Sequence, residues 1–161
     1  MHNISKTALI VGISFLTTFP ALCEDASKTA QPQKEIQDTA KATKFFEDEL
    51  NYKTNPHGVK MAVEGKVKNV TIVDLRSAKE FAKGHIPGAI NLPHNKYNNF
   101  EGSETDFPGL KKDGFNYVYC YELLCTLSLK AALKFASLGY PVKEMVGGFS
   151  EWKKHKYPVE K

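Results

Sequence analysis

The distribution of apolar and polar residues divides the chain into a polar N-terminal segment and a domain that begins near residue 41. Residues 24–40 are polar and have no apolar stripe, so we expect a linker or a loose arm there. Over residues 41–51 apolar side chains recur at helix-like spacing, which predicts a short amphipathic helix with Phe45, Phe46 and Leu50 on its apolar side. The expected domain therefore covers residues 41–161.

From residue 70 onward, short apolar runs alternate with stretches of helical periodicity. The apolar runs predict strands at residues 70–75, 89–92, 115–119 and 142–146. A long polar connection is expected over residues 94–113, and a last helix that holds Trp152 is expected after Gly148 and before Pro158.

Capping residues mark where several helices begin. Asn55 followed by Pro56 predicts a helix start, because Asn caps helices well and Pro suits the first helical turn. Ser77 and Glu80 have the spacing of a capping box, which predicts a short helix after the strand at residues 70–75. Apolar residues at helical spacing predict a further helix over residues 126–138.

The alternation of strands and helices predicts an α/β fold. Such a pattern implies a central parallel sheet, here of about five strands, with helices on both faces. In sheets of this kind, ligands bind outside the carboxyl ends of the strands. Cys120 directly follows the strand at residues 115–119 and precedes a helix, so we expect it at the binding edge of the sheet.

The first 23 residues have the layout of a secretory signal peptide, with a short basic start, a short apolar run and a small-residue exit. Ala21 and Cys23 occupy the −3 and −1 positions of a cut before Glu24. An uncleaved N-terminal anchor is the alternative, although the apolar run is too short to span a bilayer comfortably. We expect a periplasmic or secreted protein without stable membrane insertion after cleavage.

Composition excludes several other classes of protein. The chain is 42% hydrophobic and 25% charged, which is typical of a globular protein and not of a disordered one. The formal net charge is +4, and the lysines are scattered, so we expect no nucleic-acid partner. The histidines lack ligand-like spacing, and we therefore expect no metal site.

Cys120 is the strongest candidate for chemistry. A thiol between a strand and a helix N-terminus lies near backbone N–H groups and the positive end of the helix dipole, and both favour the nucleophilic thiolate. The opposite interpretation is a buried apolar residue that finishes the strand, because free cysteine is among the most buried residue types. Position alone does not decide between these two interpretations.

Several groups of residues, in order along the chain, resemble the sequence signatures of rhodanese-like domains. The matching groups are residues 73–77, 80–81, 84–93, 118–120 and 138–140, with Gly147, Gly148 and Trp152. The resemblance covers roughly residues 41–160 and implies the rhodanese fold, a central parallel sheet flanked by helices.

The same resemblance implies an activity. Cys120 would accept a sulfane sulfur as a persulfide and pass it to a thiophilic acceptor, either a small molecule or a protein. No metal or organic cofactor is needed for this transfer. The implied active-site loop consists of Tyr121, Glu122, Leu123, Leu124, Cys125 and Thr126.

Three further polar residues are expected to support this site. In the family, residues at the positions of Asp74 and Arg76 hold neighbouring loops together by hydrogen bonds and ion pairs, so a structural role is implied for both. His85 is expected to fix the turn in which it lies. The apolar loop residues Tyr121, Leu123 and Leu124 either face a hydrophobic donor or a protein partner, or they pack.

The loop departs from the usual family pattern, because it has neither the Gly nor the Arg that normally follow the cysteine, and Glu122 adds negative charge. With Cys125 it resembles a less common subset that carries a second cysteine. Cys125 either resolves a persulfide, forms a reversible disulfide with Cys120, or packs into the helix start.

Three functions stay open: a sulfurtransferase or sulfane-sulfur carrier, a non-catalytic binding module on the same fold, and a thiol–disulfide protein that uses Cys120 and Cys125. Phosphatase activity, known in relatives with a longer loop, requires an Arg to clamp phosphate and is set aside, since residues 121–128 contain none.

Overall fold

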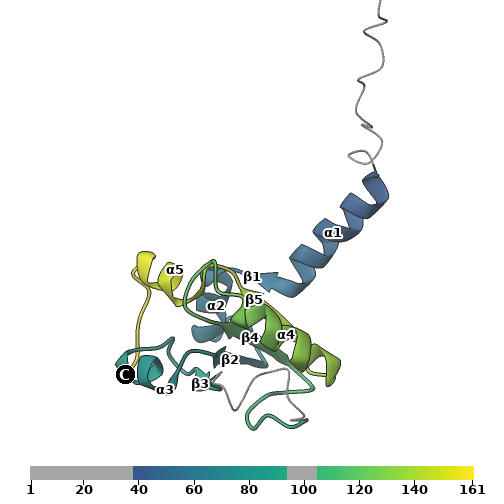
Figure 1. The fold of residues 1–161 in the computed structure, drawn as a ribbon. Coiled ribbons are helices and arrows are strands. Elements are labelled where there is room, and N and C mark those ends of the chain that lie inside the picture. The colour runs from purple at the N-terminus through teal and green to yellow at the C-terminus, as the bar shows by residue number, and fades with distance from the viewer. Residues whose placement is uncertain (1–37, 94–104) are drawn as a thin grey trace, which may run out of the picture. The chain divides into compact units, whose positions relative to one another are not determined.

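In a computed structural model of the protein, the described residues are 38–93 and 105–161 (Figure 1). The expected signal peptide at residues 1–23, nearly all of the expected linker at residues 24–40, and part of the connection at residues 94–113 lie outside them. Within the described ranges, no helix is long and apolar enough to cross a membrane.

The centre of the domain is a five-stranded parallel sheet, which confirms the predicted fold class. Its strand order is β1-β5-β4-β2-β3. The strands are β1 (Lys53–Thr54), β2 (Val70–Asp74), β3 (Ile90–Asn91), β4 (Phe115–Tyr119) and β5 (Val142–Met145). β1 was not predicted, because two residues, one of them charged, carry no strand pattern. The other four strands lie where the sequence pattern placed them: β4 has the predicted bounds, and β2, β3 and β5 are one or two residues shorter than predicted.

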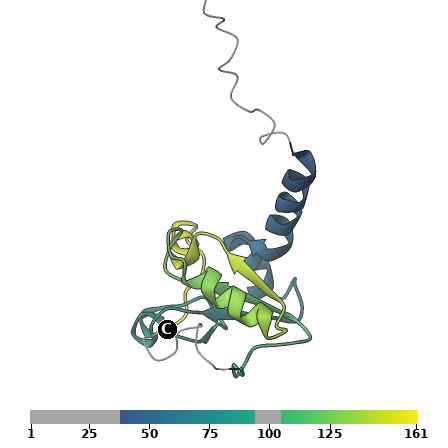
Figure 2. The same cartoon turned by 45° about the vertical axis from the view of Figure 1, so that its right-hand side comes forward.

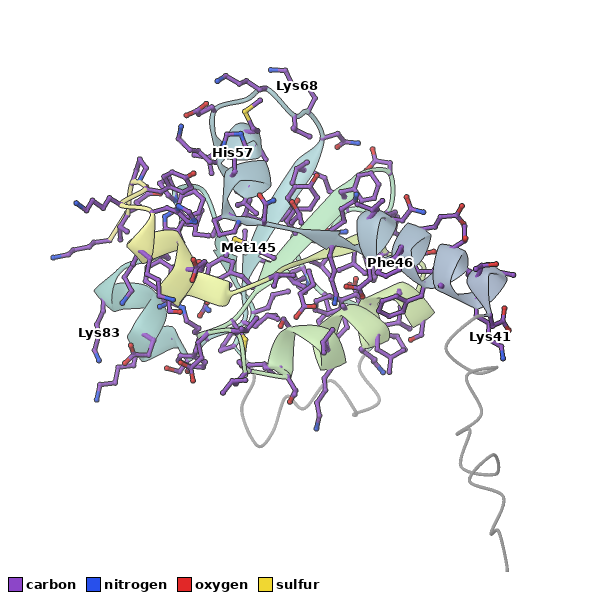
Figure 3. The ribbon with its side chains drawn as sticks, turned by 90° about the horizontal axis from the view of Figure 1, so that it is seen from above. Lys41, Phe46, His57, Lys68, Lys83 and Met145 are labelled. Atoms are coloured by element: carbon purple, nitrogen blue, oxygen red, sulfur yellow. A yellow bond between two sulfur atoms is a disulfide. The ribbon has the colours of Figure 1, made fainter. Side chains whose placement is uncertain are left out.

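Helices cover both faces of this sheet (Figures 2 and 3). The helices of the described residues are α1 (Thr39–Tyr52), α2 (Pro56–Val63), α3 (Ala78–Lys83), α4 (Leu127–Ser137) and α5 (Gly148–Lys154). One buried cluster joins α4 to the sheet through Ala131 and Phe135. A second cluster, on the other face, joins α2 and α5 to the sheet through Val59 and Trp152. The predicted two-faced covering of the sheet is therefore confirmed.

Strand alternation decides which face Cys120 joins. Along β4, Tyr117 and Tyr119 pack in the cluster with α2 and α5, whereas Val118 packs in the cluster with α4. Successive residues of a strand point to opposite faces. Cys120 therefore follows Val118 onto the face covered by α4, and it belongs to the same buried cluster.

The predicted helix starts at Asn55 and Ser77 are confirmed by their caps. The Asn55 side chain accepts a hydrogen bond from the Gly58 N–H at 2.9 Å, and the Ser77 hydroxyl accepts one from the Glu80 N–H at 3.3 Å. Each bond satisfies a backbone donor that the first helical turn leaves unpaired.

The amphipathic helix predicted at residues 41–51 is present as α1, and it begins two residues earlier, at Thr39. None of its residues is buried. Phe45, Phe46 and Leu50, the apolar positions of the pattern, are all more than half exposed. The pattern thus identified the helix, but in the described structure its apolar side is not covered.

Candidate active site

Cys120 lies at the carboxyl end of β4, the strand between β5 and β2 in the sheet. Its side chain is only 1% exposed. The site expected from the sequence is therefore at the predicted edge of the sheet, but its principal cysteine is a buried one. This burial agrees with the interpretation of Cys120 as a residue that finishes the strand, and its role as a nucleophile stays a prediction.

The first turn of α5 holds the residues around Cys120 in place. The Phe149 N–H donates to the Cys120 carbonyl at 2.8 Å, and the Ser150 N–H donates to the Tyr121 carbonyl at 2.9 Å. Gly148 makes this approach possible: its φ is +58°, and a Cβ there would lie 2.7 Å from the Glu122 nitrogen. Only glycine combines that dihedral with so close a contact.

Cys120 and Cys125 form a disulfide, with their Cα atoms 6.6 Å apart. The loop between them is irregular, and the Cys125 N–H donates to the Glu122 carbonyl at 3.1 Å. A regular helix would hold residues with this separation too far apart for a disulfide. Of the alternatives that the sequence left open for Cys125, the structure therefore contains the disulfide.

A buried serine and a glutamate lie behind this disulfide. The Ser128 hydroxyl, in the first turn of α4, lies 3.7 Å from the Cys120 sulfur. It donates to a carboxylate oxygen of Glu144, on β5, at 2.6 Å. Neither residue was among those predicted from the sequence. The only available signal was the pair of charged residues, Lys143 and Glu144, inside the predicted strand at residues 142–146.

The rest of the active-site loop is turned to the outside. Leu123 and Leu124 are 69% and 85% exposed, and Glu122 and Thr126 are exposed as well. Tyr121 is fixed at one end, since its hydroxyl accepts a hydrogen bond from the Ser77 N–H at 3.1 Å. The leucines thus remain an uncovered apolar surface beside the disulfide.

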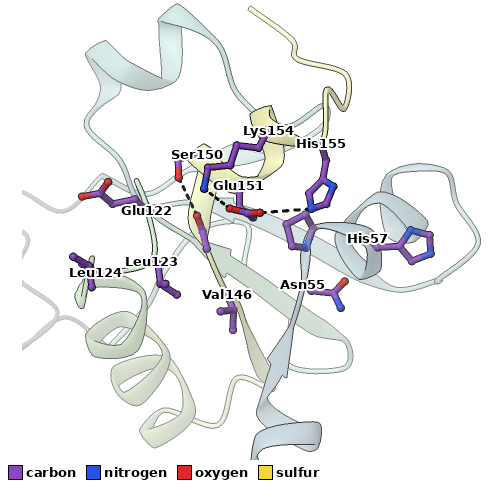
Figure 4. Close-up of a pocket in the computed structure, with 12 residues that line it drawn as sticks. Asn55, His57, Glu122, Leu123, Leu124, Val146, Ser150, Glu151, Lys154 and His155 are labelled. Carbon is purple, nitrogen blue, oxygen red and sulfur yellow. Dashed lines mark hydrogen bonds and ion pairs between the residues drawn. The ribbon is translucent and has the colours of Figure 1, made fainter.

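A cavity of about 650 Å³ opens next to this loop (Figure 4). Leu123 and Leu124 line one side, and residues of α5 and the start of α2 line the other. On the α5 side, Lys154 binds Glu151 at 2.8 Å, and the His155 ring lies 3.7 Å from the same carboxylate. The side chains that line this cavity are thus both apolar and charged.

A smaller cavity of about 140 Å³ lies between the loop and the end of β5. Cys125, Ser128 and Glu144 line it, and Cys120 does not. The two cavities share Glu122 and Leu123 in their linings. The small cavity is therefore next to the large one, and Cys125 is the cysteine that it contacts.

Asp74 and Arg76 form a separate buried cluster. Asp74 is fully buried, and Arg76 is 3% exposed. The Arg76 guanidinium donates to Asp74 at 2.6 Å and to the Gly84 carbonyl at 2.8 Å, and the Tyr119 hydroxyl donates to Asp74 at 2.6 Å. These bonds tie the end of β2 to the end of α3 and to β4, as a supporting role would require.

Burial and the charges of this cluster shift two pKa values. Burial alone would lower the pKa of Arg76, but the hydrogen bonds and the charge of Asp74 outweigh it and raise that pKa. Burial raises the pKa of Tyr119 far above its ordinary value, and the Asp74 carboxylate adds to this shift. Arg76 is the only arginine in the sequence, and it is held by Asp74 rather than by the loop at Cys120.

His85 lies in its turn and not at the disulfide. Its Nδ1 is 3.0 Å from the Phe81 carbonyl, its ring stacks on that of Phe81, and its backbone pairs with that of Glu160. These contacts are those of the structural role expected for it. Among the described residues there is no group of His, Cys, Asp or Glu that could hold a metal ion.

Comparison with known proteins identifies the family. The model of the rhodanese-like domain family matches residues 59–155. The chain therefore belongs to the rhodanese-like domain family, as the sequence signatures implied.

Several curated proteins are similar to parts of the chain. A thiosulfate sulfurtransferase GlpE from Shewanella oneidensis is 35% identical over 89 residues, which are 54% of this chain and 79% of that protein. The chloroplastic thiosulfate sulfurtransferase 16 of Arabidopsis thaliana is 31% identical over 55% of this chain and 78% of its own length. The HTH-type transcriptional regulator Rv0324 of Mycobacterium tuberculosis is 32% identical over 56% of this chain, but the match spans only 38% of the regulator.

Solved structures share the fold. The BH2092 protein from Bacillus halodurans superposes with a TM-score of 0.66 and 30% sequence identity, over 76% of this chain and 86% of that one. The rhodanese-like domain of the Alr3790 protein from Anabaena gives a TM-score of 0.53 at 27% identity, over 67% of this chain and 77% of that one. The five-stranded parallel sheet is thus the fold of rhodanese-like domains.

Proposed function

We propose that the protein is a sulfurtransferase or sulfane-sulfur carrier that works through a persulfide on Cys120. The observation that carries the proposal is the position of this residue, at the carboxyl end of β4 and before α4, in a family whose similar members include thiosulfate sulfurtransferases. The N-terminal end of an 11-residue helix favours a thiolate.

The reaction begins with Cys120 in the reduced state. Its thiolate attacks the sulfane sulfur of a donor R–S–SH, the S–S bond of the donor breaks, and R–S⁻ leaves. A new S–S bond joins the transferred sulfur to the Cys120 sulfur, so that Cys120 becomes a persulfide. A thiophilic acceptor, a small molecule or a protein, then attacks the outer sulfur, and the Cys120 thiolate is regenerated.

The charges near Cys120 favour particular donors. Glu144 lies behind Ser128, Glu122 lies in the loop, and the only arginine of the chain is bound to Asp74. An anionic donor such as thiosulfate gains from positive charge and loses from negative charge. We therefore propose uncharged or weakly charged organic persulfides, which can contact Leu123 and Leu124, as the preferred donors.

Mass spectrometry of the reduced protein tests this function. After incubation with an organic persulfide, we expect a gain of one sulfur that maps to Cys120. Cys120→Ser should abolish the gain, whereas Cys125→Ser should retain it. A reduced protein that gains no sulfur would contradict the proposal, and a gain that requires Cys125 would contradict the assignment to Cys120.

A second candidate is favoured by the disulfide itself. A thiol–disulfide protein would cycle Cys120 and Cys125 between the disulfide and the dithiol while it oxidises or reduces a partner. This function needs both cysteines, so either Cys→Ser substitution would abolish it. A non-catalytic binding module would instead tolerate Cys120→Ser and lose its partner when Tyr121 or Leu123 is changed.

We also propose that the protein is exported, on the basis of the signal-like residues 1–23, and that it acts in the periplasm or outside the cell. Oxidising surroundings of this kind allow disulfides to persist. N-terminal sequencing of the protein recovered from its native compartment tests this: we expect a first residue of Glu24, and an intact Met1 would contradict cleavage.

A further inference from the structure

The disulfide must be opened before Cys120 can act as a nucleophile, and the two sulfur atoms are not equally placed for attack. Cys120 is 1% exposed and packs in the cluster that joins α4 to the sheet. Cys125 is partly exposed and lines the small cavity between the loop and β5. An incoming thiol therefore reaches Cys125 first.

Accessibility, and not the stability of the leaving thiolate, distinguishes the two sulfurs. In thiol–disulfide exchange, the sulfur that leaves is the one whose thiolate is more stable. Both cysteines precede α4, which begins at Leu127, and Cys125 is the nearer of the two in sequence, so the positive end of this helix does not single out Cys120. Ser128 lies 3.7 Å from the Cys120 sulfur, but it donates its hydroxyl proton to Glu144 at 2.6 Å and so does not stabilise a thiolate on Cys120. Attack on the Cys125 sulfur releases the Cys120 thiolate, and attack on the Cys120 sulfur releases the Cys125 thiolate. The more accessible sulfur therefore decides which thiolate is released.

The charged residues that line the small cavity also favour one charge of the incoming thiol over another. Its charged lining residues are Glu122, Glu144 and Lys53, and the Lys53 ammonium is bound to Glu49 at 2.7 Å. In the neighbouring larger cavity, Lys154 and His155 both lie against Glu151. A thiol that approaches Cys125 therefore meets two carboxylates and cations that already have carboxylate partners.

We propose that Cys125 is the entry site for reduction, and that the small cavity takes a small thiol with a positively charged tail. The thiolate of the incoming molecule attacks the Cys125 sulfur. The Cys120–Cys125 bond breaks, and its electron pair stays on Cys120. The products are a mixed disulfide between the thiol and Cys125 and a free Cys120 thiolate. This inference goes beyond the proposed sulfur transfer and stands without it.

Three monothiols of similar size provide the probes: 2-aminoethanethiol, which is cationic, 2-mercaptoethanol, which is neutral, and 2-mercaptoethanesulfonate, which is anionic. The oxidised full chain is exposed to each thiol, quenched in acid and alkylated, and fragment spectra then locate the adduct. The folded protein is expected to carry the adduct on Cys125 and the alkyl group on Cys120. The same chain unfolded in denaturant gives the intrinsic rate and the intrinsic partition for each thiol.

Relative to the unfolded chain, we expect the cationic thiol to react at least about fivefold faster than the anionic one, because two nearby carboxylates attract one and repel the other. Glu122→Gln and Glu144→Gln should each reduce that ratio. Glu47→Gln is the matched control, since Glu47 is an exposed carboxylate of α1 that lines neither cavity, and it should leave the ratio unchanged.

Adducts on Cys120, or the same partition in the folded and the unfolded chain, would overturn the assignment of Cys125. A normalised preference for the anionic thiol would overturn the assignment of charge. Neither result depends on sulfur transfer, which is measured separately as the gain of one sulfur on the reduced protein.

Discussion

Replacing Asp74 with Asn should remove a large part of the stability of the domain. The substitution keeps the shape of the side chain but removes the charge that balances the buried Arg76 guanidinium. In the native structure Asp74 accepts hydrogen bonds from the Arg76 side chain, the Arg76 backbone N–H and the Tyr119 hydroxyl. The Asn side chain has one acceptor oxygen where Asp74 has two. Its NH₂ group is a donor that would face the donors of Arg76 and Tyr119.

Breaking one partner of a buried ion pair costs about 3–5 kcal/mol, because the other charge stays buried without compensation. For a domain of this size, that loss lowers the melting temperature by roughly 10–20 °C. Tyr119→Phe removes only one hydroxyl, which donates to Asp74 and accepts from the Ile86 N–H, and should cost about 1–3 kcal/mol.

Urea unfolding followed by circular dichroism measures these differences in the free energy of unfolding. Lys83→Gln serves as the control, since it breaks an exposed ion pair with Glu80 and should leave that free energy nearly unchanged. The double variant Asp74→Asn with Arg76→Met should be more stable than Asp74→Asn alone. A loss below about 1 kcal/mol for Asp74→Asn would refute the reasoning that this ion pair supports the loops.

Three other expectations follow from the structure. Gly148→Ala should destabilise the protein by at least about 1–3 kcal/mol in thermal unfolding, because φ is +58° and the new Cβ would meet the Glu122 nitrogen; wild-type stability would contradict this. In the reduced protein, Glu144→Gln should lower the pKa of Cys120, measured from the pH dependence of its alkylation, because a nearby negative charge disfavours a thiolate; an unchanged or raised pKa would contradict it. Hydrogen bonds from two lysines hold the pKa of Glu64 at about 2, so its contribution to stability is present above pH 4.5 and is lost as the pH falls through about 2; a carboxyl titration by NMR near 4.5 would refute this.

Much of the fold could be predicted because its main signals are local. The runs at β2 and β4 are short and rich in β-branched or aromatic residues, and the caps at Asn55 and Ser77 lie within three residues of the groups that they satisfy. β1 could not be predicted, since its two residues become a strand only by pairing with β5. The exposure of the apolar side of α1 could not be predicted either, because periodicity shows that a helix face is apolar but not whether another element packs against it.

The residues of the candidate site could likewise be predicted only in part. Cys120 was predicted from its position between a strand and a helix, and the family signatures led to the same residue. Ser128 and Glu144 were missed because they are 16 residues apart and meet only when α4 packs on β5. The disulfide to Cys125 stayed open, since it depends on the irregular path of the loop, which no pattern of residue types specifies.

The hydrogen bonds between α5 and the loop have an optical consequence. The chain contains a single tryptophan, Trp152, which is fully buried on α5 and donates to the Pro158 carbonyl at 2.8 Å. The first turn of this helix donates to the carbonyl groups of Cys120 and Tyr121. A change in the covalent state of the two cysteines is therefore connected, through one short helix, to the only indole fluorophore of the protein. We therefore expect its emission to change when the disulfide opens, which would report the reaction in real time without any attached dye.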